Sequence, residues 1–261
     1  MLVSAWRYRR FILSSIAAEF RLRFARSRMG AAWMIAQPLA QVAIFAFVLS
    51  GLLSARVPGV TGPHAYVIYL MAGTLCWSLF ADVVSRCLTI FIDNGNLIKK
   101  ISFPRVTLPV IVVGIALVNN AFLFAALMIG AVLLGHWPGL ALVWLVPLSL
   151  LTLALATGFG VVLGVINVFV RDTAQAVSVV LQALYWLTPI VYMTSILPER
   201  YRNIPELNPL TPLVAAYQAI FLTRTSPDWP SLVPVLFIAV GMLFVSLTIF
   251  RRAGPEMADV L

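Results

Sequence analysis

Six long apolar runs, separated by short polar or turn-rich segments, organise this 261-residue chain. Each run has about the 20 apolar residues that a helix needs to cross the hydrocarbon core of a bilayer. The segments between them carry Pro, Gly, Asn or charge, which end helices. We therefore predict an all-α integral membrane protein with six transmembrane helices. The predicted spans are residues 31–55, 65–91, 108–134, 140–168, 174–194 and 232–250.

Residues 1–30 precede the first run and predict a different element. Ile12, Leu13, Ile16, Phe20 and Phe24 share one face of a helical wheel, and most arginines lie elsewhere. This pattern is typical of an amphipathic helix lying on the inner leaflet. The alternative is a basic flank that only fixes the topology of the first span. We divide the chain accordingly into this cytoplasmic interfacial segment, residues 1–30, and a transmembrane domain, residues 31–261.

The connection between the fifth and sixth runs contains "LTPLVAAYQAIFL", which is apolar but too short to cross a bilayer. Prolines separate it from its neighbours, because proline interrupts helices. We predict two short re-entrant helices that form an outer gate, with Pro198, Asn208 and Pro209 as gate residues.

Local spacing predicts the roles of a few further residues. Gly160 and Gly164 have small-x-x-x-small spacing, which permits close helix packing on the fourth span. Asp172 is expected to cap the start of the fifth span, and Pro189 is expected to kink that span near its outer end.

Composition agrees with a membrane location, since 62% of the residues are hydrophobic, 10% are charged and the mean hydropathy is +1.00. The net charge of +9 is distributed asymmetrically. With the N-terminus inside, four of the 18 basic residues face outward, namely Arg56, Arg200, Arg202 and Arg224. Positively charged loops stay in the cytoplasm, so both termini are predicted to be cytoplasmic. Basic residues beside apolar spans indicate contact with membrane lipids and not with nucleic acid.

The sequence contains no motif for nucleotide hydrolysis or for metal or hydrolytic catalysis. The dipeptide Gly-Lys of a phosphate-binding loop is absent, as are H-E-x-x-H and G-x-S-x-G. Cys76 and Cys87 are eleven residues apart on one predicted helix, too far for a disulfide, and read as buried small residues. Asp82 and Arg86 have the spacing of a pair along one helix face. We predict that the chain is not an enzyme and binds no cofactor itself.

The segment "NGNLIKKISFPRVTLP", residues 94–109, is a short basic stretch between two predicted spans on the cytoplasmic side. Its apolar residues follow helical spacing and Phe103-Pro104 would end the helix. We predict a coupling helix whose apolar side fits a groove on a cytoplasmic ATPase. An ordinary positive loop is the alternative. The coupling residues are Asn96, Leu97, Ile98, Lys99, Lys100, Ile101, Phe103, Pro104 and Arg105.

Four stretches, in order along the chain, resemble the ABC-2 type permeases that export O-antigen, capsular polysaccharide and teichoic acid. They are "RFARSRMGAAWMIAQPLAQ", "NLIKKISFPRVTLP", "NVFVRDTAQAVSVVLQALYWLTPIVY" and "ILPERYRNIPELNPLTPLVAAYQAIF". Gln218 departs from the pattern, because relatives are expected to carry Arg there.

The resemblance implies a homodimer in the bacterial inner membrane, bound to two copies of an ABC ATP-binding subunit that binds ATP and Mg. It also implies a polysaccharide cargo, such as O-antigen on undecaprenyl pyrophosphate, moving through a channel at the dimer interface.

Candidate residues for that cargo are aromatic and basic. Aromatic side chains can hold the apolar face of a sugar ring without fixing register, although they also form interfacial belts. The channel candidates are Trp33, Phe45, Tyr69, Trp77, Phe80, Tyr185, Trp186 and Tyr192. Arg23, Arg26 and Arg28 could bind the pyrophosphate, or could only set topology. Two other functions stay open: an ABC-2 exporter of a drug or lipid, and a membrane enzyme that acts on lipid-linked sugars.

Overall fold

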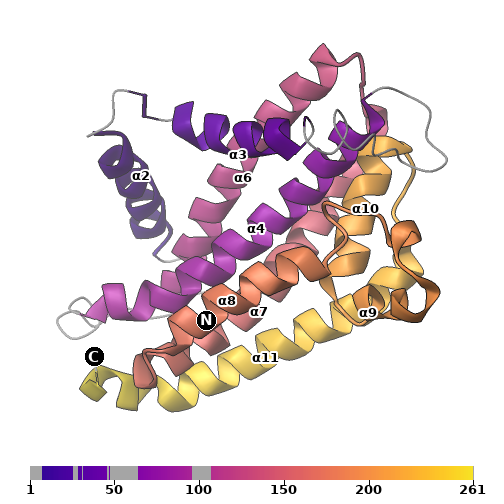
Figure 1. The fold of residues 1–261 in the computed structure, drawn as a ribbon. Helices are drawn as coiled ribbons and strands as arrows, with labels where there is room; N and C mark the ends of the chain where they lie inside the picture. The colour runs from indigo at the N-terminus through magenta and orange to yellow at the C-terminus, as the bar shows by residue number, and fades with distance from the viewer. Residues whose placement is uncertain are drawn as a thin grey trace.

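The computed structural model of the protein describes residues 8–25, 29–30, 32–45, 47, 64–95 and 107–260. Every regular element within these ranges is helical, which confirms the all-α prediction for this part of the chain. In chain order the elements are α2 (Arg9–Ala25), α3 (Ala32–Phe45), α4 (Ala65–Asp93), α6 (Thr107–Leu133), η2 (Gly139–Trp144), α7 (Leu145–Phe169), α8 (Thr173–Leu187), η3 (Thr194–Ile196), η4 (Glu199–Tyr201), α9 (Asn203–Glu206), α10 (Leu210–Leu222) and α11 (Trp229–Val260) (Figure 1).

Within the described ranges, four helical segments are long and apolar enough to cross a membrane: Ala65–Asp93, Thr107–Leu133, Gly139–Phe169 and Trp229–Ala253. They agree with the second, third, fourth and sixth predicted spans to within a few residues. The third of these segments joins the 3-10 helix η2 to α7. The chain is therefore a multi-pass membrane protein.

The first predicted span is described only in part, and the fifth is shorter in the structure than predicted. Within residues 31–55, α3 covers Ala32–Phe45, and most of the remainder lies outside the described residues. Within residues 174–194, α8 ends at Leu187, so the prediction for its last seven residues is wrong. Thr188 is extended, with φ −86° and ψ 134°, because the proline that follows disfavours a helical conformation there. Pro189 thus ends the helix, where we had expected it to kink a longer one.

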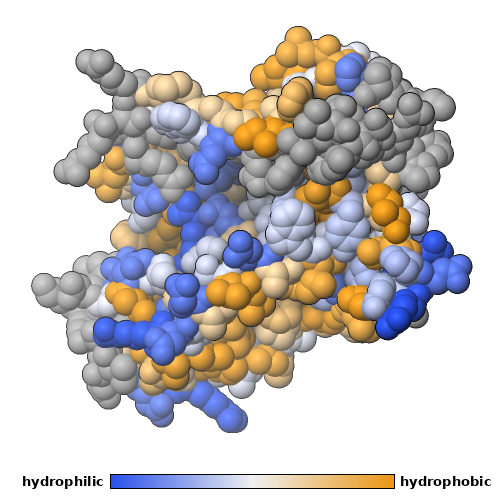
Figure 2. All heavy atoms as spheres, in the orientation of Figure 1, coloured by the Kyte–Doolittle hydropathy of each residue, from blue (hydrophilic) through white to orange (hydrophobic). Residues whose placement is uncertain are grey.

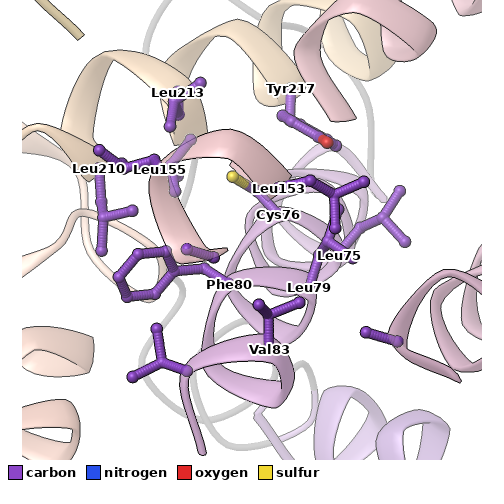
Figure 3. Packing of buried hydrophobic residues seen from close by; sticks show 14 of the residues in the cluster. Leu75, Cys76, Leu79, Phe80, Val83, Leu153, Leu155, Leu210, Leu213 and Tyr217 are labelled. Carbon is purple, nitrogen blue, oxygen red and sulfur yellow. The ribbon is translucent and has the colours of Figure 1, made fainter. Parts of the chain in front are cut away.

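The helix α4 lies at the centre of the bundle and packs against α6, α7 and α10, while α7 also packs against α11. Figure 3 shows Leu75, Cys76 and Leu79 of α4 facing Leu153 and Leu155 of α7 and Leu213 and Tyr217 of α10. Both cysteines are buried and unbridged, as predicted. This core places one long face of α4 against protein and leaves another for the site described below.

Glycines allow α7 to approach its two neighbours closely. A Cβ atom added at Gly160 would lie 2.7 Å from Cys87 Cβ, and one at Gly164 would overlap the carbonyl oxygen of Cys87. On another face of α7, a Cβ atom at Gly158 would lie 2.8 Å from Met242 Cβ of α11. The prediction that Gly160 and Gly164 serve helix packing is confirmed.

The helix α2 packs against the first half of α6. Ile12 forms a small cluster with Ile111 and Ile115, and Ile16 and Phe20 pack onto it. The shared face predicted for α2 is therefore correct for these residues. It is wrong for Leu13, which is 65% exposed, because the packed face follows every fourth residue from Ile12 and Leu13 is turned away from it. The side chain of Phe24 lies outside the described residues.

Candidate functional site

A groove of about 770 Å³ runs between α4 and α8, and we call it the polar groove. Its lining combines hydroxyl, amide and aromatic side chains with a few apolar ones. The lining residues are Thr74, Trp77, Ser78, Ala81, Ser85, Leu88, Thr89, Leu123, Ala174, Ser178, Leu181, Gln182, Tyr185 and Trp186. Figure 2, in the orientation of Figure 1, shows a hollow across this face with hydrophilic and near-neutral residues in it and hydrophobic residues around it.

Helical periodicity explains how the sequence builds this lining. Four hydroxyl residues of α4 follow one another at intervals of about one or two helical turns, so they form one stripe along the helix. They are Thr74, Ser78, Ser85 and Thr89. On α8, Ser178 and Gln182 are four residues apart and face the same space. Ser85, Thr89, Ser178 and Gln182 are exposed and have no hydrogen-bond partner within the described ranges. The groove therefore offers free hydroxyl and amide groups in a protein that is 62% hydrophobic.

Three of the predicted aromatic residues meet at one end of the polar groove. Trp77 of α4 and Tyr185 of α8 are in edge-to-face contact, with ring centroids 5.5 Å apart. Tyr185 and Trp186 are also edge to face, at 5.7 Å. Trp186 is 56% exposed, so its ring is open to a ligand. This aromatic end lies toward the Leu187 end of α8, and the hydroxyl groups extend toward the Thr173 end.

The other predicted aromatic residues do not line the polar groove, although the ring of Phe80 contacts that of Trp77, with centroids 6.0 Å apart. Phe80 is 5% exposed and belongs to the hydrophobic core cluster. Trp33 is exposed on α3. Tyr69 binds backbone groups beyond the end of α8, and Tyr192 binds the last residue of that helix. Phe45 is the last residue of α3, and its side chain lies outside the described residues.

Asn167 fixes the first turn of α8. Its side chain is 2% exposed, and its Nδ2 donates to the carbonyl oxygen of Leu88 on α4 at 2.7 Å. Its Oδ1 accepts a hydrogen bond from the Ala174 amide in the first turn of α8 at 3.1 Å. We had expected Asp172 to cap this helix. Asp172 occupies the N-cap position but makes no capping side-chain hydrogen bond, because Asn167 from α7 already provides the acceptor.

Side chains from α4 and α10 bind the turn that follows α8, residues 188–192. The Tyr69 hydroxyl lies 2.8 Å from the carbonyl oxygens of both Pro189 and Tyr192 and donates to them. Gln218 Nε2 donates to the same Pro189 oxygen at 3.1 Å. Gln218, the residue that departs from the family pattern, thus helps to hold the turn that follows α8.

Of the three predicted gate residues, Asn208 binds this turn directly. Asn208 Nδ2 donates to Thr188 Oγ1 at 2.8 Å, and its Oδ1 accepts from the Leu210 amide at 3.0 Å. Asn208 therefore joins the end of α8 to the start of α10. Pro209 occupies the N-cap position of α10, and Pro198 occupies that of η4. The Tyr192 hydroxyl donates to the Leu187 carbonyl oxygen at 3.0 Å.

A charged cluster lies on α4 beside the polar groove. Arg86 Nε is 2.7 Å from Asp82 Oδ1, which confirms the predicted pair. Arg86 also contacts Glu19 Oε1 of α2 at 3.5 Å, and Asn119 Nδ2 of α6 donates to Asp82 Oδ2 at 2.8 Å. The cluster therefore ties α2 and α6 to α4. The involvement of Glu19 could not be predicted, because it depends on how α2 docks.

The predicted coupling residues, from Asn96 to Arg105, lie outside the described residues, as do Arg26 and Arg28. Arg23 belongs to α2, but its side chain is not described. Across the residues that are described, no group of three or more His, Cys, Asp or Glu side chains could hold a metal ion. The chemistry of the polar groove is therefore that of binding through aromatic faces and neutral hydrogen-bonding groups.

Sequence reasoning missed the hydroxyl residues of the polar groove and the role of Asn167. The former had a usable signal: Thr74, Ser78, Ser85 and Thr89 repeat at helical spacing in an apolar run, which indicates one polar face. Asn167 had no local signal, because its two partners come from different helices.

The ABC-2 type transporter family matches residues 11–222 of the chain. The chain is similar to an O-antigen export system permease protein RfbA of Klebsiella pneumoniae, with 27% identity over 93% of this chain and 92% of that protein. It is similar to the protein of the same name from Myxococcus xanthus, with 25% identity over 97% and 96% of the two chains. It also resembles the polysialic acid transport protein KpsM of Escherichia coli, at 21% identity over 92% of each chain.

Proposed function

Because the chain belongs to the ABC-2 type transporter family, we propose that it is the permease subunit of an ATP-driven exporter that moves a polysaccharide, such as O-antigen, out of the cytoplasm. The observation that carries this proposal is the polar groove, walled by aromatic and hydroxyl side chains, in a chain similar along more than nine-tenths of its length to O-antigen export permeases.

The lining of the polar groove suits a sugar polymer. The rings of Trp77, Tyr185 and Trp186 can face the C–H surface of a sugar, and this contact needs no fixed register. The hydroxyl and amide groups further along can exchange hydrogen bonds with sugar hydroxyls as the chain advances. A path of this kind binds each residue of the polymer alike, and so permits sliding.

The exposure of α8 supports a homodimer with the path at its interface. Val177 is the one buried residue of α8, while Val179, Val180 and Trp186 are each more than half exposed. A second copy related by a twofold axis would cover this helix and place two polar grooves face to face. The closed channel would then be lined by α4 and α8 of both copies.

The energy source in this proposal is a separate ATP-binding subunit, present in two copies, which binds ATP and Mg. Residues 96–105 would contact it as the coupling helix. The Asp93 end of α4, the Thr107 end of α6, the Thr173 end of α8 and the C-terminus of α11 lie on one side, at the left in Figure 1. This arrangement supports a common cytoplasmic face at the inner membrane, with α2 lying along it. Arg23, Arg26 and Arg28 precede the first span there and would bind the pyrophosphate of an undecaprenyl-linked cargo.

Reconstitution in vesicles with the cognate ATP-binding subunit tests the proposal. We expect ATP-dependent movement of a lipid-linked polysaccharide and ATP turnover that this cargo stimulates. Replacing Tyr185 and Trp186 together by Ala should lower export at least tenfold and leave binding of the ATP-binding subunit unchanged. The matched control is Trp137→Ala, which removes a 59% exposed tryptophan outside the polar groove.

The outcomes separate the candidate functions. Unchanged export in the double variant would remove the polar groove from the path. Movement of small amphiphiles without polymer would favour a drug or lipid exporter. Sugar transfer that does not depend on the ATP-binding subunit would indicate a membrane enzyme.

A further inference from the structure

We propose that the polymer carried through the polar groove is built from uncharged sugars, and that the groove discriminates against a polymer with an acidic group in every repeat. This inference rests on the proposed function and deepens it, because it names the chemical class of the cargo. It follows from what lines the groove and from the charges nearest to it.

Among the residues that the structure describes, none of those that line the polar groove is charged. The groups that a passing polymer meets are hydroxyls, the Gln182 amide, aromatic rings and apolar side chains. A neutral sugar hydroxyl can replace its hydrogen bonds to water with bonds to these groups. An ionised carboxylate cannot recover its hydration in the same way, because full compensation needs a cation or several donors directed at it.

The charges nearest to the groove on α4 do not supply such a cation. Arg86 is adjacent in sequence to Ser85 of the lining, but its guanidinium contacts the carboxylates of Asp82 and Glu19. Because Arg86 is already paired with these carboxylates, its charge is not available to a carboxylate of the polymer.

A twofold dimer would not add a cation to the groove, because the second copy contributes the same uncharged lining to the opposite wall. The pyrophosphate of a lipid-linked cargo is a different case. It passes once for each polymer, whereas a carboxylate in each repeat passes once for every step of translocation. The discrimination is therefore expected in the rate of polymer movement and not in the capture of the lipid anchor.

The test compares two cargoes in vesicles that contain the chain and its ATP-binding subunit. One is a polyprenyl-pyrophosphate-linked glucan, and the other is the same polymer with its C6 hydroxyls oxidised to carboxylates. We expect the neutral glucan to move at least tenfold faster. The Gln182→Lys variant places a cation in the groove and should reduce this preference at least threefold. The matched control is Gln175→Lys, on an exposed residue of α8 that does not line the groove.

Equal rates for the two polymers would overturn this inference and leave the proposed function standing. A preference that Gln175→Lys reduces as much as Gln182→Lys would also overturn it, since the effect would then come from surface charge. If neither polymer moves and ATP turnover does not respond to either, the proposed function fails and the inference fails with it.

Discussion

The two helices that border the polar groove are built in opposite ways. Eighteen residues of α4 are buried, whereas α8 buries Val177 alone. The position of α4 is fixed along its length by contacts with α6, α7 and α10. The position of α8 is fixed at its ends, by Asn167 at the start and by Tyr69, Gln218 and Asn208 beyond its end. The comparison teaches that one wall of the groove, α4, belongs to the core, whereas the other wall, α8, is fixed mainly at its two ends.

The largest effect is expected from disturbing the packing of α4. Gly164→Val should lower the free energy of unfolding by about 3 kcal/mol, because the new side chain meets the backbone of Cys87, which cannot move aside. Thermal unfolding of the purified protein in detergent measures this change. The matched control is Gly241→Val on α11, where a Cβ atom would have nothing within 4 Å. Equal melting temperatures for the two variants would show that α4 and α7 are not in close contact.

A smaller loss in the free energy of unfolding is expected when the contacts of Asn167 at the start of α8 are removed. Asn167→Ala removes the hydrogen bonds to Leu88 and Ala174 and should cost about 2 kcal/mol, since both bonds are protected from solvent by burial of Asn167. Asp172→Ala, at the N-cap position itself, should change the free energy of unfolding by less than about 0.5 kcal/mol. Chemical denaturation of both variants checks the order. If Asp172→Ala cost more, the cap would belong to Asp172.

Each side chain that binds the turn after α8, residues 188–192, should contribute less to the free energy of unfolding. Tyr69→Phe removes one hydroxyl that serves two carbonyl oxygens, and should cost about 1 kcal/mol. We also expect faster amide hydrogen exchange in residues 188–192, measured by mass spectrometry. Tyr192→Phe is the control, because its hydroxyl bonds the exposed end of α8 and its loss should leave exchange in this turn nearly unchanged. Similar exchange in both variants would contradict a special role for Tyr69.

The smallest effect on the free energy of unfolding is expected for exposed side chains of α8. Trp186→Ala should change the free energy of unfolding by less than about 0.5 kcal/mol, because the side chain is 56% exposed. Unfolding in detergent checks this, with Phe80→Ala as the buried counterpart, for which we expect a loss of about 3 kcal/mol. A large loss for Trp186→Ala would mean that α8 is fixed along its length after all.

The sequence was sufficient for features that depend on long apolar runs. The spans of α4, α6, α7 and α11 were predicted to within a few residues, because each run is bounded by polar or turn-forming residues. The pair of Asp82 and Arg86 and the packing role of Gly160 and Gly164 also depend on spacing within one helix, and both were predicted correctly.

Features that join distant parts of the chain could not be predicted. The hydroxyl of Tyr69 was expected at the channel, but it binds carbonyl oxygens about 120 residues away along the chain. The cap of α8 was assigned to Asp172 because the assignment considered only neighbouring residues, whereas Asn167 reaches it across a turn. The hydrophobicity of residues 188–194 continued the run, so hydrophobicity alone could not reveal that Pro189 ends the helix.

The contacts that Gln218 and Asn208 make beyond the end of α8 have a consequence for the order in which parts of the chain fold during synthesis. Gln218 and Asn208 are synthesised after α8, yet both bind residues at its end. During membrane insertion α8 can meet Asn167 and Tyr69 as soon as it emerges, but the contacts from Asn208 and Gln218 form only after α10 has been made. A ribosome-bound chain that stops before residue 208 should therefore expose residues 188–192 to protease more than a chain released after α10.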